Sequence, residues 1–310
     1  MGSNPQEFHE QSYARHEDHF KDYALGGDRE SRAKTWFEKD TVDAWRHHRI
    51  YNFLDPIIAA LPGARWLTVG DGRYGNDAKY LLDKGCDVLA TDISDALLKE
   101  PKARGFISDY RKENAESLSF RDAEFDYVLC KESYHHCPRP MLALYEILRV
   151  AKKGVCLIEP NDAYVNSNFT QSILRNLKNL AKVLLRKTPV SEAFSKHAFE
   201  ESGNYIFIIS KREIEKVALG LNYKVVAFKG YNDAYFDGVE NEKLADNGPL
   251  QRKVRRLIYL ADMLCKMGLM DYANLVAIIF KQKPSDALLQ GLLKEGYEIA
   301  TLPNNPYISD

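Results

Sequence analysis

The fold of this chain is decided by the stretch Trp66-Leu67-Thr68-Val69-Gly70-Asp71-Gly72-Arg73-Tyr74-Gly75, an apolar run that ends in a glycine-rich turn. Because glycine has no side chain, such a turn can leave a strand sharply and bring the backbone close to a ligand. A second apolar run, 87–91, ends at Asp92, 20 residues after Gly72. A carboxylate placed there can accept hydrogen bonds from a ribose. Together the two features predict a site for an adenosine-containing cofactor.

Short apolar runs alternate with helical segments through the middle of the chain. This pattern is typical of a parallel sheet with helices on both faces. Strands are expected at 64–69, 87–91, 106–107, 125–130, 155–159, 223–228 and 276–281, and helices at 76–84, 141–150 and 210–219. Ser210 is the expected N-cap of the helix over 210–219.

The remaining segments do not follow that alternation and define the expected domain organisation. Residues 1–50 are polar and aromatic and are expected to form an N-terminal helical cap. The main domain then covers 51–284, with helical insertions at 161–205 and 232–272 that build an acceptor pocket. The tail, 285–310, has a short helical pattern and a Pro/Asn-rich end that could pack or fray.

Composition places the chain among ordinary globular enzymes and excludes several partners. It has 310 residues, 45% hydrophobic and 28% charged, and its net charge of -1 gives no reason to expect a nucleic acid. No apolar run approaches the roughly 20 residues of a membrane helix, and the first twenty residues do not resemble a secretory signal. The five cysteines are odd in number and include apolar positions, which favours reduced thiols in the cytoplasm. No Cys/His spacing resembles a zinc site. Asn161 and Asp162, after the fifth expected strand, could bind a divalent metal, but no further set of acidic ligands accompanies them, so no metal is expected.

Five further motifs follow Asp92 in order. They are Asn114-Ala115-Glu116-Ser117-Leu118-Ser119-Phe120, Phe125-Asp126-Tyr127-Val128, Tyr134-His135-His136-Cys137-Pro138-Arg139-Pro140, Glu146-Ile147-Leu148-Arg149-Val150-Ala151-Lys152-Lys153-Gly154, and Leu157-Ile158-Glu159-Pro160. The glycine turn alone would also suit an NAD-dependent dehydrogenase. The succession resembles the class I S-adenosylmethionine (SAM) methyltransferase family, in its small-molecule branch. The resemblance implies a Rossmann-like α/β fold with a seven-stranded, mostly parallel sheet whose last strand is antiparallel.

The resemblance also implies which residues bind SAM and its product S-adenosylhomocysteine. Gly70, Asp71 and Gly72 would border the methionine and ribose portion of the cofactor. Asp92 would hold the ribose hydroxyls, and Ile93 would lie against the adenine.

Two later segments complete the implied cofactor site. Asn114, Ala115 and Glu116 would form the rim around the adenine, and Cys130 and Lys131 would border the methyl group that is transferred.

Two positions depart from the pattern of the family. Thr68 stands where the family usually has an acidic residue, and Asn114 stands where it usually has aspartate. An asparagine can still present its amide to the adenine edge.

The segment after the fourth expected strand supplies candidates for catalysis. His135 or His136 could act as a general base toward an acceptor hydroxyl, since an unperturbed histidine titrates near neutrality. Glu132 and Glu159 are weaker candidates, because either could be a structural carboxylate held by backbone amides.

Cations and aromatic residues of the cap and the insertions leave several interpretations open. Arg46 or Arg49 could pair with the carboxylate of SAM, or their helix could pack aromatics on the sheet and solvate its arginines. The amphipathic pattern over 171–187 has an apolar face and a basic stripe. That stripe could be a solvated face, a membrane contact or part of a lid over a diphosphate, and 252–256 begins a similar helix.

These observations predict a cytoplasmic SAM-dependent methyltransferase with a small-molecule acceptor. The first expectation is O-methylation of a hydroxyl on a sugar, a sugar-like metabolite or a nucleotide sugar. N-methylation of a small amine is the alternative within the same class. A non-catalytic SAM-binding protein or regulatory subunit is the alternative from another class.

Overall fold

The computed structural model describes residues 5–24, 26–166, 168–185, 187, 189, 195, 197–200 and 203–307. Its strands are β1 (Arg65–Val69), β2 (Asp87–Asp92), β3 (Tyr110–Lys112), β4 (Phe125–Lys131), β5 (Ala151–Pro160), β6 (Val225–Tyr231), β7 (Asn274–Phe280) and β8 (Glu298–Thr301). Its helices are α1 (Pro5–Lys21), α2 (Glu30–Lys34), α3 (Val42–Tyr51), α4 (Asp55–Ala60), α5 (Asn76–Asp83), α6 (Lys99–Ala103), α7 (Pro140–Val150), α8 (Ala163–Asn166), α9 (Phe169–Leu184), α11 (Lys211–Gly220), α12 (Pro249–Lys266) and α13 (Asp286–Lys294). Short 3-10 turns are η1 (Thr35–Phe37), η2 (Asn52–Leu54), η3 (Asp95–Leu97), η4 (Tyr134–His136) and η5 (Leu244–Asp246).

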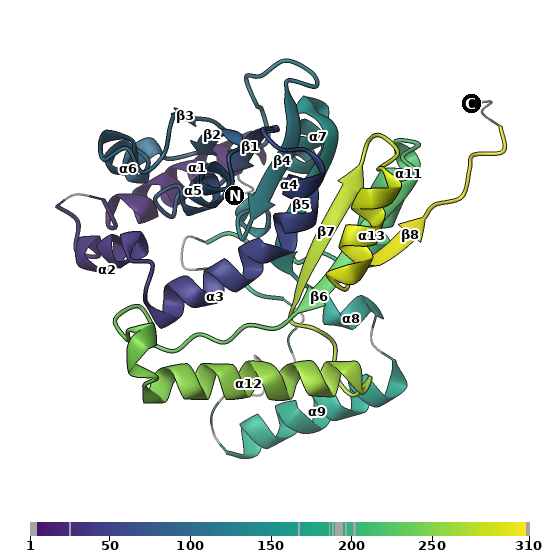
Figure 1. The fold of residues 1–310 in the computed structure, drawn as a ribbon. Coiled ribbons are helices and arrows are strands. Elements are labelled where there is room, and N and C mark those ends of the chain that lie inside the picture. Colours follow the sequence, from purple (N-terminus) through teal and green to yellow (C-terminus); the bar gives the residue numbers. More distant parts are fainter. Residues whose placement is uncertain are drawn as a thin grey trace.

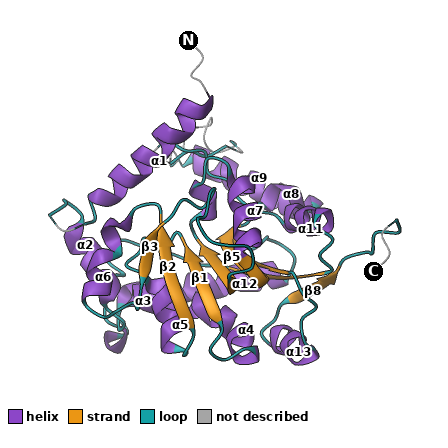
Figure 2. Cartoon of the chain, turned by 90° about the horizontal axis from the view of Figure 1, so that it is seen from above, coloured by secondary structure: helices purple, strands orange, loops and turns teal. Residues whose placement is uncertain are grey.

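The strands form one mixed sheet in the order β3-β2-β1-β4-β5-β7-β6-β8. The strands from β3 to β5 in this order are parallel, and β7 runs antiparallel to both β5 and β6. Helices cover the sheet on both faces (Figures 1 and 2). The predicted Rossmann-like α/β class is therefore confirmed.

The sheet has one strand more than the seven that were expected. Strand β8 comes from the C-terminal tail and pairs antiparallel with β6 at the edge of the sheet. The tail is held down because Leu292 of α13 is fully buried and the hydroxyl of Tyr297 donates to the carbonyl of Phe53 at 2.9 Å. The four residues of β8 show little apolar alternation, so the local sequence does not predict a strand there. The pairing of β8 with β6 therefore depends on tertiary contacts.

The third strand also lies elsewhere than predicted. The expected strand at 106–107 is a turn, and β3 begins at Tyr110. Ile107 is buried, and a Cβ on Gly75 would lie 2.7 Å from its side chain. The apolar residues at 106–107 therefore pack near the glycine turn. A run of only two apolar residues cannot be distinguished from a short strand by its pattern.

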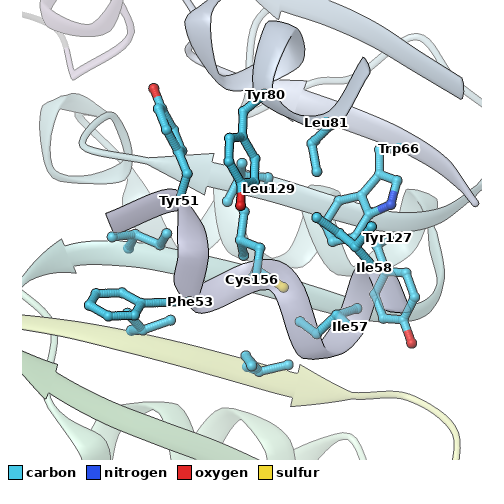
Figure 3. Close-up of a cluster of buried hydrophobic side chains, with 14 of the residues drawn as sticks. Tyr51, Phe53, Ile57, Ile58, Trp66, Tyr80, Leu81, Tyr127, Leu129 and Cys156 are labelled. Atoms are coloured by element: carbon cyan, nitrogen blue, oxygen red, sulfur yellow. The ribbon is translucent and has the colours of Figure 1, made fainter. Parts of the chain in front are cut away.

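Two hydrophobic clusters lie on opposite faces of the sheet. One includes side chains of α4, α5 and α13, and the other includes side chains of α7 and α11. In the first cluster the rings of Trp66 and Tyr127 stack with centroids 5.0 Å apart, next to Leu129 and Cys156 (Figure 3). Ser210 caps α11 as expected, because its Oγ accepts from the amide of Glu213 at 3.2 Å.

The N-terminal segment and the insertion before β7 are joined beside the sheet. The amide of Val42 at the start of α3 donates to the carbonyl of Glu242, and the amide of Asp43 donates to the carbonyl of Val239. Val42 and Val239 pack with Val254 of α12 in a small separate cluster. In the described part of the chain, no helix is long and apolar enough to cross a membrane.

Candidate active site

The glycine turn follows β1 and lies against the carboxyl end of β2. The amide of Gly70 donates to the carbonyl of Thr91 at 2.9 Å. Gly70 has a φ of 76°, and a Cβ on it would lie 1.9 Å from Oγ of Ser133. A Cβ on Gly72 would lie 2.8 Å from a carboxylate oxygen of Asp92. The backbone therefore comes closer to both neighbours than a residue with a side chain could.

Asp92 ends β2 as a buried carboxylate. Its Oδ1 accepts from the amide of Ser94 at 2.8 Å, and the amide of Gly72 also donates to it. Burial raises the pKa of Asp92 to about 6, because the carboxylate loses its solvation. The group is ionised at neutral pH and can accept hydrogen bonds from two neighbouring hydroxyls.

A cavity of about 640 Å³ opens beside this carboxylate, and we call it the Asp92 cavity. It lies at the carboxyl ends of the parallel strands, where open α/β sheets bind their ligands. Helix α1 forms part of its wall. The lining residues are Ser12, Tyr13, His16, Phe20, Val69, Gly70, Asp92, Ile93, Glu113, Asn114, Ala115, Glu116, Glu132, Ser133, His136, Cys137, Pro138 and Asn204.

Glu132 follows β4 directly and lies where two hollows meet. It has a φ of 51°, a left-handed conformation that is strained for a residue with a side chain. Solvent reaches 40% of its side chain through the two hollows, and Nζ of Lys131 donates to Oε2 at 2.7 Å. Burial acts against the carboxylate, but Lys131 and Arg73 outweigh it and lower the pKa of Glu132 to about 2. Glu132 is therefore a permanent anion at the junction.

The second hollow measures about 630 Å³, and we call it the Arg46 chamber. Arg46 donates to Asp43 at 2.7 Å and forms a second ion pair with Asp233. The chamber contains three arginines, three carboxylates, three aromatic rings and a histidine. These residues are Tyr23, Arg32, Trp36, Asp43, Arg46, His47, Arg73, Glu132, Tyr235 and Glu240.

Comparison with known families identifies the part of the chain that carries Asp92 and Glu132. Residues 67–158 match the model of a family described as a methyltransferase domain, a span that runs from β1 into β5 and includes Asp92 and Glu132. The chain contains a class I SAM-dependent methyltransferase domain.

Relatives of the methyltransferase domain were found among curated proteins and solved structures. The demethylmenaquinone methyltransferase of Renibacterium salmoninarum is 33% identical over 147 residues, which cover 46% of this chain and 62% of that protein. The ubiquinone biosynthesis O-methyltransferase of Xanthomonas campestris pv. campestris is 31% identical over 129 residues, covering 39% and 54%. The YcgJ protein of Bacillus subtilis is 16% identical with a TM-score of 0.48, covering 77% and 100%. The chain spans less than two thirds of the length of these curated relatives.

The structure brings most of the predicted cofactor residues of the methyltransferase domain to one cavity. Gly70, Asp92, Ile93, Asn114, Ala115 and Glu116 all line the Asp92 cavity. Gly72 does not line the cavity, but its amide donates a hydrogen bond to Asp92. Asp71, Cys130, Lys131 and Arg46 are not among the lining residues.

Asp71 has a structural environment inside the methyltransferase domain. Its carboxylate accepts from the hydroxyl of Thr68 at 2.8 Å and from the amides of Asp77 and Ala78 at 3.1 and 2.8 Å. These amides belong to the first turn of α5, where a carboxylate is favourable. Thr68, the position that departs from the family, therefore helps to hold the carboxylate that caps α5.

Cys130 and Lys131 are buried behind Glu132. The thiol of Cys130 lies 3.3 Å from Oγ of Ser133, and burial raises its pKa. The ammonium of Lys131 lies 3.3 Å from Nδ1 of His47. Burial acts against this ammonium, but Glu132 outweighs it and the pKa of Lys131 is raised. Both side chains support the junction rather than line the cavity.

Glu116 connects the methyltransferase domain to the helix that covers the cavity. Its carboxylate accepts from the amide and Nε of Arg139 at 2.7 and 2.6 Å and from the hydroxyl of Tyr13 at 2.5 Å. Oδ1 of Asn114 accepts from the amide of Glu116 at 2.9 Å, which stabilises the turn between them. Asn114 and Glu116 thus line the cavity and also form hydrogen bonds within the protein.

The two neighbouring histidines have different partners. Nδ1 of His135 lies 2.5 Å from Oε2 of Glu159, whose other oxygen accepts from the amides of Ser133 and Tyr134. Burial acts against the imidazolium of His135, but Glu159 outweighs it and the pKa of His135 is raised. Glu159 is therefore the amide-bound structural carboxylate that the sequence suggested.

His136 lines the Asp92 cavity, and its Nδ1 lies 2.6 Å from Oε2 of Glu200. Its ring approaches that of His16, whose pKa burial lowers to about 4. His16, His136 and Glu200 could together face a cation, with their ligand atoms within 4.8 Å of one another. Ligands bound at about 2.0–2.1 Å to a tetrahedral ion lie more than about 3 Å apart, so His136 and Glu200 would have to separate first.

The sequence predicted a helical cap and a pocket-forming insertion over 161–205, but it named none of their residues that line the Asp92 cavity. Tyr13, His16 and Phe20 line the cavity, and Asn204 joins them through a hydrogen bond from Ser12 at 2.6 Å. The signal was the spacing of Tyr13, His16 and Phe20 by three and four residues, which places them on one face of a helix. Asn204 carried no local signal.

Proposed function

We propose that this chain binds SAM in the Asp92 cavity and transfers its methyl group to a small-molecule acceptor held in the Arg46 chamber. The observation that carries the proposal is that Glu132 lines both hollows. A methyl donor and an acceptor placed in them would meet at this residue. Methyl transfer depends strongly on such alignment.

The residues around the Asp92 cavity fit the adenosine portion of SAM. The ionised carboxylate of Asp92 would accept hydrogen bonds from the ribose hydroxyls, and Gly72 leaves room for their approach. Ile93 and Ala115 would pack against the adenine. The methionine portion would extend past Gly70 toward Glu132. When bound, SAM supplies an electrophilic methyl group on a sulfonium.

Glu132 is the residue best placed to orient the acceptor. With a pKa near 2 it is a poor proton acceptor, so its role would be to accept a hydrogen bond and hold the nucleophile in line. His136 lines the Asp92 cavity and is paired with Glu200, and it would take the proton of an acceptor hydroxyl that reaches past Glu132 into that cavity. His135 lies further back, against Glu159.

The chemistry of the Arg46 chamber favours a polar, hydroxyl-bearing acceptor such as a sugar or nucleotide sugar. Glu132 and Glu240 can accept hydrogen bonds from hydroxyls, and Arg32 can hold an anionic group. The rings of Trp36 and Tyr235 can cover the apolar face of a sugar.

The names of the relatives favour a second acceptor class. Two of them are named for demethylmenaquinone and ubiquinone, and one of these is called an O-methyltransferase. A third, from Enterobacter lignolyticus, is called a malonyl-[acyl-carrier protein] O-methyltransferase and is 28% identical, covering 35% of this chain and 46% of that protein. A hydroxyl of a quinone-type small molecule is therefore the second candidate, and an amine is the alternative that needs no base.

Calorimetry with SAM, S-adenosylhomocysteine and NAD tests the cofactor. We expect both sulfur compounds to bind and NAD not to bind, and binding of NAD alone would overturn the proposal. Release of S-adenosylhomocysteine is then followed with nucleotide sugars, catechols and small amines, each with and without EDTA. We expect turnover with a hydroxyl acceptor and no effect of EDTA. SAM binding without turnover of any acceptor would instead support a non-catalytic binding protein.

A further inference from the structure

Helix α9 turns its apolar side chains away from the protein. Phe169, Leu177 and Leu184 are 82%, 56% and 73% exposed, and Ile173 and Leu180 are exposed as well. A surface helix normally buries its apolar stripe. An apolar stripe that faces outward marks a surface that contacts something else.

The face of α9 that meets the protein is mainly polar. Its partly buried residues are Gln171, Ser172, Arg175, Asn179 and Val183. Arg175 donates to the carbonyl of Ala163 at 2.9 Å. The helix is therefore attached through its polar side, and its start is closed by a capping box between Asn168 and Gln171.

Helix α12 adds further exposed apolar side chains at the same end of the molecule. Leu257, Tyr259, Leu260, Met263 and Met267, in α12 and at its C-cap, are exposed. Both helices lie at the bottom of the view in Figure 1, and Nδ2 of Asn168 donates to the carbonyl of Gly268 at 3.5 Å. We call the exposed side chains of both helices the α9–α12 surface.

This surface is also positively charged. The sequence of α9 has no aspartate or glutamate, and its exposed positions include Lys178 and Lys182. The sequence of α12 has five basic residues and one acidic residue, Asp262. The two helices therefore carry a net positive charge in a chain that has 43 basic and 44 acidic residues overall.

We propose that the α9–α12 surface docks on an anionic lipid bilayer, with α9 lying in the plane of the interface. An amphipathic helix can bury its apolar face at the boundary of headgroups and acyl chains, while its basic residues attract anionic lipids. A second copy of the chain fits less well, because a two-fold dimer would set this positive surface against itself.

The docked orientation has a consequence for the active site. Helices α8 and α9 follow the carboxyl end of β5, and β5 is parallel to β4, which ends beside Glu132. The carboxyl ends of parallel strands lie at the same edge of a sheet. Docking through α9 therefore brings the edge that holds the Asp92 cavity toward the lipid surface.

Co-sedimentation of the full chain with vesicles tests the proposal. We expect binding to phosphatidylglycerol-containing vesicles, weaker binding in high salt, and little binding to pure phosphatidylcholine. Leu177→Glu and Lys178→Glu should each weaken binding about tenfold or more. Leu293→Glu and Lys294→Glu, two exposed positions on α13, are the matched controls and should leave it unchanged.

Three results would overturn the proposal. One is the absence of vesicle binding by the folded chain, and another is equal loss of binding in the control variants. The third is a stable dimer in light scattering that Leu177→Glu dissociates, which would assign the surface to a second copy. Retained SAM binding by each variant in calorimetry confirms that the variants are folded.

Discussion

The hydroxyl of Tyr13 donates to Oε2 of Glu116 at 2.5 Å and thereby ties helix α1 to the wall of the Asp92 cavity. Glu116 keeps Arg139 as a second partner, so the carboxylate is fixed from both sides. Because Tyr13 and Phe20 line the cavity, a ligand there is covered by α1. The cap is thus part of the wall of the Asp92 cavity, and the hydroxyl of Tyr13 attaches it at this point.

We expect Tyr13→Phe to weaken SAM binding by about 2–10-fold, since it removes the hydroxyl that donates to Glu116 and accepts from Arg139 but leaves the ring in place. Calorimetry measures the change. Tyr145→Phe, an exposed tyrosine on α7, is the control and should bind as the unmodified chain does. Equal affinity in both variants would mean that α1 does not close over the cofactor.

We expect Asp92→Asn to weaken SAM binding by about 10–100-fold, because hydrogen bonds to a charged group are lost. The affinity of the unmodified chain should also fall below about pH 6, where Asp92 takes up a proton. Asp87→Asn, the exposed aspartate at the start of β2, should change neither result. Calorimetry across pH decides, and a flat profile would contradict a role for this carboxylate.

The same substitution should raise the stability of the ligand-free protein. The pKa of Asp92 is about 6 when folded and about 3.9 when unfolded, so above pH 6 the buried charge subtracts from stability. This cost disappears as pH falls from 6 toward 4. At pH 7 Asp92→Asn should therefore gain up to about 2–3 kcal/mol in urea unfolding. A loss of stability would contradict the buried charge.

We expect His136→Ala to lower kcat by about 10²–10⁴-fold and to remove the acid limb of the pH profile. Glu132→Gln should lower kcat but keep that limb, because Glu132 is ionised throughout the working range. Glu159→Gln distinguishes His135 from His136 as the candidate base. It removes the carboxylate that raises the pKa of His135, so a limb that moves to lower pH would assign the base to His135 instead.

We expect Leu292→Ala to lower the free energy of unfolding by about 2–5 kcal/mol, because its fully buried side chain joins α13 to the core. Leu293→Ala is the neighbouring control and should cost little, since that side chain is 49% exposed. Urea unfolding of the two variants measures the difference. Equal costs would show that the tail does not pack as described.

The local sequence pattern was sufficient to predict most strands of the sheet. The apolar runs that became β1, β2, β4, β5 and β7 are long enough to be recognised, and the glycine turn and Asp92 stand at their ends. The prediction failed where the run was short. At 106–107 the apolar residues pack against Phe37 and Gly75, and at β8 a short edge strand pairs with β6.

The sequence predicted only part of the candidate site, because local patterns do not show which distant segments meet. Motif positions such as Asp92, at the end of β2, and Asn114, two residues after β3, are placed by the strands next to them. Partners such as Tyr13, Asn204 and Glu200 come from segments far away along the chain, and no local spacing connects them with the motifs.

The sequence by itself determined the Rossmann-like class and the methyltransferase motifs, because strand periodicity, glycine turns and strand-end carboxylates are local properties. Only the tertiary structure decided that Asp71 caps α5, that His135 faces Glu159 while His136 faces the cavity, and that α9 turns its apolar side outward. Burial and pairing depend on which distant segments meet. The burial and the partners of a side chain are therefore set by the packing of the whole chain, and the residues next to it in sequence do not predict them.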